Sequence, residues 1–212
     1  MKYYPLFLDL RKRPCVVVGG GQIAERKTLS LLEAGADVTI VSPSLTPKLK
    51  ELSDSNKIKH RQKHFEDKDI TDAYLVIAAT NSREVNSQVG GICRKKQVLV
   101  NVAAPPEESS FIVPSVVERG ELLIAVSTGG ASPALSRKIR LELEQRFGPE
   151  YELFLQKMTA VRNRLMEEVA DESARRAALQ ALVDSDVLDL LRQGKTREAD
   201  QRIAEVSGLH MK

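Results

Sequence analysis

The sequence predicts an α/β protein whose first part is a Rossmann-type, doubly wound parallel sheet. Three observations lead to that prediction. Short apolar runs recur between residues 15 and 102, helical patterns separate them, and a glycine-rich turn directly follows the first run. Such alternation is typical of parallel strands joined by right-handed helical crossovers.

The expected strands are short and mostly apolar. They cover residues 15–18, 37–41, 74–79 and 98–102, with a weaker strand that begins at Ile58. The run 74–79 is typical of a central strand buried on both faces.

Helices are expected between these strands. The first follows the glycine turn and ends at Gly35, and the second begins with Thr46 as its cap and Pro47 in its first position. The third runs from Ser82, another cap, to about Lys96.

The pattern changes near residue 114. Residues 113–126 suggest two β-rich stretches joined by a turn, and a helix follows with Ser132 as cap and Pro133 as first residue. From Pro149 onward the apolar residues keep helical spacing, and no strand is expected. We therefore expect three parts: a Rossmann domain over residues 1–113, a small α+β module over 114–147 and a helical domain over 148–212.

Length and composition are typical of a soluble globular protein: 212 residues, 42% hydrophobic, 29% charged, with a formal charge of +3. With so small a charge, 4% aromatic residues and no Trp, we expect no nucleic-acid partner. No apolar run approaches the roughly 20 residues that cross a bilayer. The N-terminus lacks the pattern of a signal peptide. We therefore expect no membrane association and a cytoplasmic location.

Metal and disulfide chemistry are not expected. Cys15 and Cys93 lie in different elements and form no CxxC pattern, which argues against a disulfide framework or a zinc site. His60 and His64 are four residues apart, but no third ligand is suitably spaced.

The turn after the first strand carries Gly19-x-Gly21-x-x-Ala24, which predicts a dinucleotide-binding loop. Gly19 permits a tight turn, Gly21 lets a pyrophosphate approach the helix N-terminus, and Ala24 allows the helix to pack closely on the strand. A glycine turn that only packs is the alternative.

The second strand lacks the acidic residue that commonly holds the adenosine ribose. It runs instead into Ser42, Pro43 and Ser44, and either serine could hydrogen-bond a ribose. No arginine follows at once to meet a 2′-phosphate, so NAD is favoured over NADP.

Four stretches together resemble one known family. They are residues 3–27, AATN at 78–81, NVAAPPEESSFIVPS at 101–115 and IAVSTGGASPALSRKIR at 124–140. In this combination the chain resembles precorrin-2 dehydrogenase/sirohydrochlorin ferrochelatase, the N-terminal module of siroheme synthase, over about residues 1–165. The resemblance implies NAD-dependent oxidation of precorrin-2 to sirohydrochlorin, followed in some members by insertion of Fe²⁺. It also implies a homodimer whose subunits exchange contacts through the module 114–147.

The same resemblance assigns residues to the cofactor. Gln22 and Ile23 would face the pyrophosphate, Pro43 and Ser44 would lie by the adenosine, and Thr80 and Asn81 would approach the nicotinamide. The full expected cofactor set is Gly19, Gly21, Gln22, Ile23, Ala24, Ser42, Pro43, Ser44, Thr80, Asn81, Val102 and Ala103.

Ala104 stands where the family pattern Asn-Val-x-Asp-x-Pro has its catalytic aspartate, the best candidate for general base and one with an assigned role in metal insertion. Its absence predicts impaired activity. Either the chain is a natural variant or the alanine is an engineered replacement, and we favour the second because the neighbouring residues keep the family pattern. Glu107 and Glu108 follow closely and could partly substitute for the aspartate, but we expect them to be solvated loop carboxylates.

Two functions of other classes stay open beside the dehydrogenase. One is a tetrapyrrole-binding chelatase or carrier that does not oxidise its ligand. The other, weaker, is a nucleotide-sensing regulatory domain.

An anionic tetrapyrrole needs cations and hydrogen-bond donors. The glycine turn at the start of the helix after residue 132 offers such groups. The expected substrate-binding set is Ser127, Thr128, Gly129, Gly130, Ser132 and Arg137. A simple turn and helix cap is the alternative, and Arg137, Lys138 and Arg140 can each belong to an ordinary solvated helix face.

Overall fold

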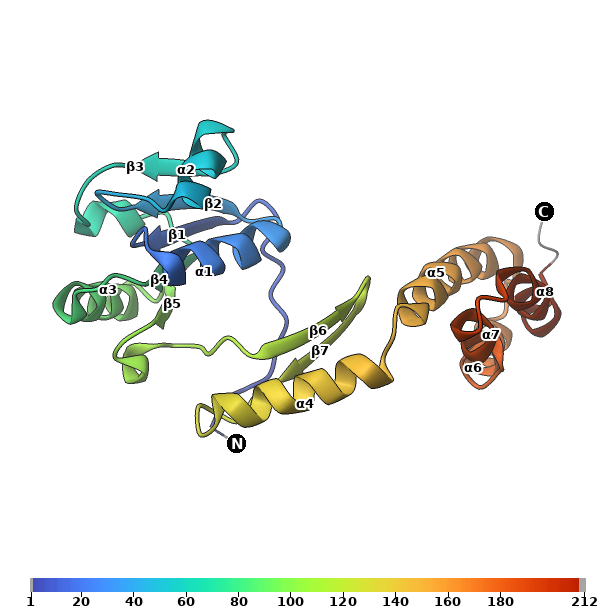
Figure 1. The fold of residues 1–212 in the computed structure, drawn as a ribbon. Coiled ribbons are helices and arrows are strands. Elements are labelled where there is room, and N and C mark those ends of the chain that lie inside the picture. The colour runs from blue at the N-terminus through green and yellow to red at the C-terminus, as the bar shows by residue number, and fades with distance from the viewer. Residues whose placement is uncertain (1, 210–212) are drawn as a thin grey trace. The chain divides into compact units, whose positions relative to one another are not determined.

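The computed structural model describes residues 2–209, and the chain divides into two compact units, Met1–Val113 and Pro114–Lys212 (Figure 1). The further division of the second unit into residues 114–147 and 148–212 stays a prediction, and its last three residues lie outside those described.

The first unit is built on a parallel sheet of five strands in the order β3-β2-β1-β4-β5. The strands are β1 (Pro14–Val18), β2 (Asp37–Val41), β3 (Lys59–Arg61), β4 (Leu75–Ala78) and β5 (Leu99–Val102). The strand order reverses between β1 and β4, and ligands of doubly wound sheets bind outside the carboxyl ends at such a switch point. The predicted α/β fold is confirmed.

The third strand begins one residue later than expected. The pairing of β2 with β3 covers only Lys59 to Arg61, and Ile58 is a buried core residue just before the strand.

Helices connect the strands and cover both faces of the sheet. They are α1 (Gln22–Glu33), α2 (Pro47–Asp54) and α3 (Arg83–Lys95), with short 3₁₀ helices η1 (Asp67–Ile70) and η2 (Pro106–Glu108). The expected caps form: the side chains of Thr46 and Ser82 accept hydrogen bonds from the third residue of α2 and of α3.

Each face of the sheet has its own apolar core because alternate strand residues point to opposite faces. Cys15 and Val17 of β1 join the core under α1 and α2, while Val16 and Val18 join the core under α3. Both cysteines are buried free thiols, and burial raises the pKa of each to about 11.

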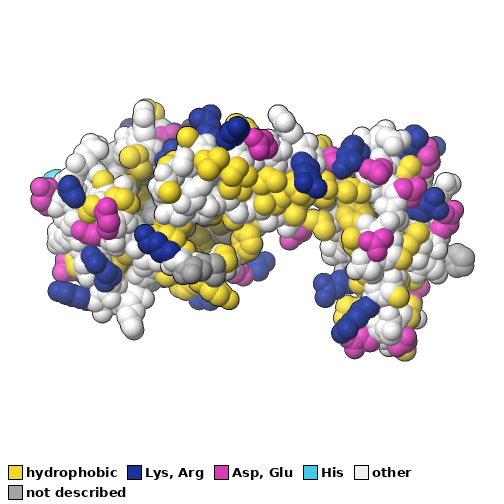
Figure 2. Space-filling model, turned by 90° about the horizontal axis from the view of Figure 1, so that it is seen from below, with side chains coloured by type: hydrophobic (Ala, Val, Ile, Leu, Met, Phe, Trp, Pro, Cys, Tyr) yellow, Lys and Arg dark blue, Asp and Glu magenta, His cyan; other side chains and the backbone are white. Residues whose placement is uncertain are grey.

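The second unit begins with a β-ribbon. Strands β6 (Ser115–Arg119) and β7 (Leu122–Val126) pair antiparallel, and α4 (Pro133–Arg146) follows with Ser132 as its cap. Exposed apolar side chains belong to this part: Val116, Leu123, Leu135 and Leu141. Apolar side chains also gather in a broad band on the face shown in Figure 2.

The rest of the second unit is helical, as expected. It contains α5 (Glu150–Glu168), α6 (Glu172–Val183), α7 (Val187–Arg192) and α8 (Thr196–Ser207). Phe154, Val161, Leu165 and Leu182 contribute to a separate apolar core. Gly208 ends α8 in a left-handed conformation, as helix-terminating glycines do. Over residues 2–209, no helix has the length and apolar character that a membrane span requires.

Candidate functional site

A cleft of about 570 Å³ opens at the carboxyl ends of β1, β2 and β4, at the switch point of the sheet. Its size is that of a small-molecule or cofactor site. Three chain segments supply most of its walls, namely the glycine loop 19–21, the segment 42–46 after β2 and the segment 79–82 after β4. His64 and Phe65 complete it from the segment after β3.

The three consecutive glycines of the loop meet three different requirements. Gly19 has φ +121°, and a Cβ there would collide with the carbonyl oxygen of Ala79. A Cβ on Gly20 would collide with the carbonyl oxygen of Ser44. Gly21 has an ordinary φ of −88°, and a Cβ there would meet no atom within 4 Å.

Gly21 is therefore not needed by the fold itself. Its missing side chain leaves open the space in front of the N-terminus of α1, where helical N–H groups are available to an anion. The loop thus fits the pyrophosphate of a dinucleotide. The requirement for Gly20 was not visible in the sequence, because it depends on a contact with a segment more than twenty residues away.

The three residues after Gly21 lie in the first turn of α1. Gln22 and Ile23 are exposed there, and neither lines the cleft. Ala24 is fully buried in the core between α1 and the sheet, which matches its expected packing role.

The segment after β2 is fastened to the glycine loop. The Thr46 N–H donates to the Gly20 carbonyl (3.0 Å), and the Thr46 hydroxyl donates to the Glu25 carboxylate (2.5 Å). Ser42 is 6% exposed, and its hydroxyl donates to the Ser44 carbonyl (2.8 Å). The Ser42 hydroxyl proton is thus already engaged, whereas Ser44 is exposed at the cleft.

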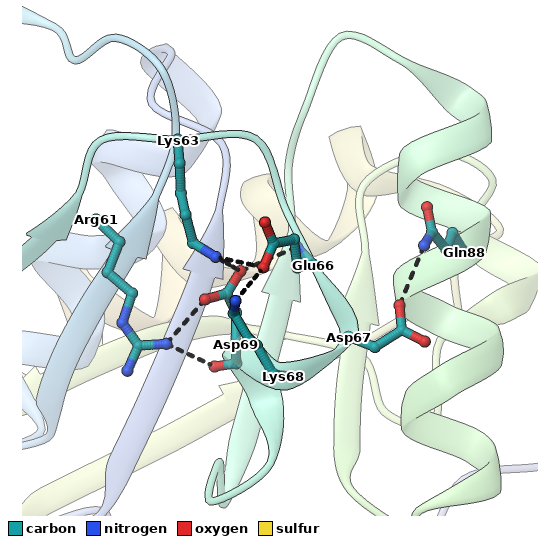
Figure 3. A network of polar contacts seen from close by, with 7 residues as sticks. All are labelled: Arg61, Lys63, Glu66, Asp67, Lys68, Asp69 and Gln88. Atoms are coloured by element: carbon teal, nitrogen blue, oxygen red, sulfur yellow. Dashed lines mark hydrogen bonds and ion pairs between the residues drawn. The ribbon is translucent and has the colours of Figure 1, made fainter.

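A charged network holds the segment that carries His64 and Phe65 (Figure 3). The Asp69 side chain is 2% exposed, and its carboxylate lies 3.0 Å from both the Arg61 guanidinium and the Lys63 ammonium. It also accepts a hydrogen bond from the Glu66 N–H (2.9 Å).

Asp69 therefore stays ionised although it is buried. Burial acts to raise the pKa of this carboxyl, but the Glu66 N–H and the two cations outweigh burial and lower the pKa below its usual value. The sequence reasoning missed this network. Its signal is a cluster of closely spaced opposite charges, which also fits a plain solvated loop: Lys63, Glu66, Asp67, Lys68 and Asp69.

The far end of the cleft is formed by Thr80 and Asn81 after β4. The neighbouring strand β5 ends in Val102, which is buried, and the Ala103 N–H donates to the Ala78 carbonyl (2.9 Å). This is the last hydrogen bond between the two strands. The side chains of Ala103 and Ala104 are exposed and do not line the cleft.

The segment after Ala104 turns back along β5. The Ser109 and Ser110 hydroxyls accept hydrogen bonds from the Val102 and Val100 N–H groups (both 2.8 Å). The Asn101 side chain donates to the Phe111 carbonyl (3.1 Å). This part of the chain is therefore built into the edge of the sheet.

The expectation that Glu108 is solvated is wrong. Its carboxylate accepts a hydrogen bond from the Ser87 hydroxyl (2.8 Å) and lies 3.7 Å from the Arg94 guanidinium, with 22% of the side chain exposed. The short helix η2 turns it toward α3, whereas Glu107 is exposed as expected.

The predicted substrate-binding residues lie in the second unit. The Thr128 hydroxyl bonds both backbone groups of Ser132 (3.0 and 3.1 Å), and the Ser127 hydroxyl accepts from the Gly129 N–H (3.0 Å). The Ser132 hydroxyl caps α4 through the Leu135 N–H (3.2 Å). These bonds fit the turn-and-cap alternative, so substrate contact stays a prediction.

The remaining members of that set are open to solvent. Gly129 and Gly130 have positive φ and no neighbouring atom within 4 Å of a hypothetical Cβ. Arg137 is exposed, while Arg140 pairs with Glu144 on the same helix.

His60, one of the two histidines considered as metal ligands, makes a structural contact instead. The His60 ring nitrogen Nε2 lies 2.9 Å from the Ser42 carbonyl oxygen. Within residues 2–209, no three His, Cys, Asp or Glu side chains group so as to hold a metal ion.

Two family models match the chain. One, described as "Putative NAD(P)-binding", covers residues 6–115, and the other, described as "Sirohaem biosynthesis protein central", covers residues 119–146.

Curated relatives include the siroheme synthase of Nitrosococcus oceani, 38% identical over 94% of this chain and 43% of its own length. Another is the siroheme synthase of Methylobacillus flagellatus, 47% identical over 68% of this chain and 31% of its own length. The chain thus spans less than half the length of these relatives. A solved structure, SirC, precorrin-2 dehydrogenase, matches with a TM-score of 0.81 and 28% identity, over 96% of this chain and all of that one.

Proposed function

The chain belongs to the NAD(P)-binding family that its residues 6–115 match, and on that premise we propose that it is an NAD-dependent dehydrogenase that oxidises precorrin-2 to sirohydrochlorin in siroheme biosynthesis. The observation that carries the proposal is the cleft at the switch point, where the space at Gly21 is open in front of the N-terminus of α1. The names of the relatives supply the substrate class.

The residues present fit a dinucleotide. The open position at Gly21 would take the pyrophosphate, the exposed Ser44 would lie by the adenosine ribose, and Thr80 and Asn81 would hold the nicotinamide end. When bound, NAD supplies the acceptor for the hydride that leaves the tetrapyrrole.

We propose NAD rather than NADP. A 2′-phosphate near the end of β2 would need a free cation. The neighbouring cations, Arg61 and Lys63, are already paired with the buried Asp69 carboxylate.

The oxidation also releases a proton, and residue 104 is the expected place for its acceptor. The Ala104 methyl group accepts no proton, and Glu108 is engaged by α3. The proton would therefore pass to solvent. Loss of a general base typically costs 10²–10⁴-fold in rate, so we propose a slow oxidation in this chain.

We further propose a homodimer formed through residues 114–147. A two-stranded ribbon is marginally stable alone, and here Val116, Leu123, Leu135 and Leu141 leave apolar surface exposed on the ribbon and on α4. A second copy would cover that surface.

The missing carboxylate at residue 104 supports a second candidate, a tetrapyrrole carrier that does not oxidise its ligand. A chelatase is the other form of this candidate, but the missing carboxylate does not support it, because the family gives that carboxylate a role in metal insertion. In that role, as in a bifunctional enzyme, Fe²⁺ would be a substrate.

Anaerobic NADH formation from precorrin-2 tests the proposal, with this chain compared with Ala104→Asp at saturating substrate. We expect slow NADH release by this chain and a gain of about 10²–10⁴-fold on restoring the carboxylate. Equal and fast rates would remove the role assigned to residue 104. Tetrapyrrole binding without NADH formation by either protein would favour the carrier or chelatase.

A further inference from the structure

We propose that Asn86, a buried residue of α3, is a positioning residue that fixes the nicotinamide end of the cleft by locking the loops after β4 and β5 together. The proposal rests on the dinucleotide binding proposed above and adds a residue to which neither sequence pattern nor resemblance assigned a role.

Asn86 is 1% exposed, and both the oxygen and the nitrogen of its amide are hydrogen-bonded. Oδ1 accepts from the Thr80 N–H (3.0 Å) and lies 2.8 Å from the Thr80 hydroxyl, whose single hydrogen is shared with the Ser82 carbonyl (3.0 Å). Nδ2 donates to the Thr80 carbonyl (3.1 Å) and to the Ala104 carbonyl (3.2 Å). A side-chain amide has two donor hydrogens, and each has its own acceptor here.

The orientation of the amide follows from its partners. The Thr80 N–H can only donate and the Ala104 carbonyl can only accept, so Oδ1 must face the first and Nδ2 the second. At neutral pH, no other residue type of this size offers both groups.

Asn86 acts where the sheet itself stops. β4 and β5 pair up to Ala78 opposite Val102, and one further bond joins the Ala103 N–H to the Ala78 carbonyl. Beyond that hydrogen bond, both segments continue as loops, and the Asn86 amide joins the two loops through its bonds to Thr80 and Ala104.

The two loops so joined have different tasks. Thr80 lines the cleft, while Ala104 is the position where the family has its proton acceptor. Fixing their separation would fix the nicotinamide relative to the reacting group, and misplacement of about 1 Å can cost 10²-fold in rate.

No hydrogen bond of the Asn86 amide reaches the adenosine half of the cleft. Its walls are the glycine loop and the segment 42–46, joined through Thr46, Gly20 and Glu25. Loss of Asn86 should therefore affect the two halves of NADH unequally, which a merely structural role would not do.

The test compares binding of NADH and of ADP-ribose, which lacks the nicotinamide, in Asn86→Asp, Asn86→Leu and the unchanged chain. Gln88→Ala, an exposed position on the same helix, is the matched control. We expect ADP-ribose affinity to stay within about 3-fold in the Asn86 variants, with NADH affinity at least 5-fold weaker.

Asn86→Asp adds a pH dependence. The ionised carboxylate can still accept from Thr80 but cannot donate to either carbonyl, whereas the protonated acid regains one donor. NADH affinity should therefore recover as pH falls in Asn86→Asp and not in Asn86→Leu. Equal loss of both ligands without recovery, or no change in either, would overturn the proposal.

Two further readouts keep the inference separate from the proposed reaction. The ratio of NADH affinity to ADP-ribose affinity can be measured without turnover. If the chain never oxidises precorrin-2, the proposed function is refuted, but the proposed role of Asn86 is still tested by this ratio. If the variants do not fold, hydrogen exchange in the unchanged chain decides: the Thr80 amide should be protected to the same degree as the β4 amides, and fast exchange there would refute the lock.

Discussion

Gly21→Ala should weaken NAD binding and leave the fold intact. This variant therefore shows whether glycine is required at position 21 by the cofactor or by the fold. The added methyl group meets no atom within 4 Å, and the φ of −88° suits any residue. We therefore expect the free energy of unfolding to change by less than about 1 kcal/mol.

The same methyl group would occupy the space that a pyrophosphate needs. Overfilling a packed site costs about 1–3 kcal/mol, which corresponds to about 5- to 150-fold weaker binding. The matched control is Gly20→Ala, where the Cβ collides with the Ser44 carbonyl oxygen and approaches Ser42 Oγ within 2.7 Å. That variant should lose about 1–3 kcal/mol of stability, a fall in Tm of about 5–20 °C.

The assay is titration with NADH, followed by its fluorescence, together with thermal unfolding of all three proteins without ligand. The expected pattern is a folded Gly21→Ala that binds poorly and a Gly20→Ala that melts early. Unchanged NADH affinity in Gly21→Ala would show that the pyrophosphate does not lie at this position. A normal Tm in Gly20→Ala would show that the segment after β2 does not press on the loop.

Other predictions concern stability and reactivity. Because the pKa of Asp69 is lowered in the folded state, the contribution of Asp69 to the free energy of unfolding should be complete above about pH 4 and disappear as pH falls through the folded pKa. Asp69→Asn should therefore reduce stability at neutral pH by about 1.5–3 kcal/mol. In a curve of stability against pH, this variant should lose less stability than the unchanged chain as the pH becomes acidic. Cys15 and Cys93, buried and with pKa values of about 11, should react with a thiol reagent at neutral pH only after denaturant is added; fast labelling of the native chain would contradict their burial. Asp171→Ala removes the acceptor for two N–H groups at the start of α6 and should cost about 0.5–2 kcal/mol in urea unfolding, with Glu172→Gln nearly neutral.

Much of the fold could be predicted because local signals were strong. Short, mostly apolar runs predicted β1, β2, β4 and β5, and the capping residues Thr46 and Ser82 predicted where α2 and α3 begin. Strand β3 was located less well, since it has three residues and only one of them is partly buried.

Parts of the site depend on contacts between distant segments, which a single sequence does not reveal. Gly20 is required by Ser44, and Glu108 is turned away from solvent by Ser87. Asn86 did leave a trace: it stands at the first position of the buried stripe of α3 that continues with Val89, Gly90 and Cys93. A polar residue at an apolar stripe position needs buried partners, but only the folded chain shows which ones.

The serine contacts along β5 have a consequence for behaviour at high concentration. This strand lies at one end of the sheet order, and exposed strand edges invite pairing with another chain, domain swapping and aggregation. Here Ser109 and Ser110 satisfy the outward N–H groups of Val102 and Val100 with side-chain oxygens. The chain blocks this edge with two hydroxyl groups of its own, so a foreign strand finds no row of unpaired donors to extend.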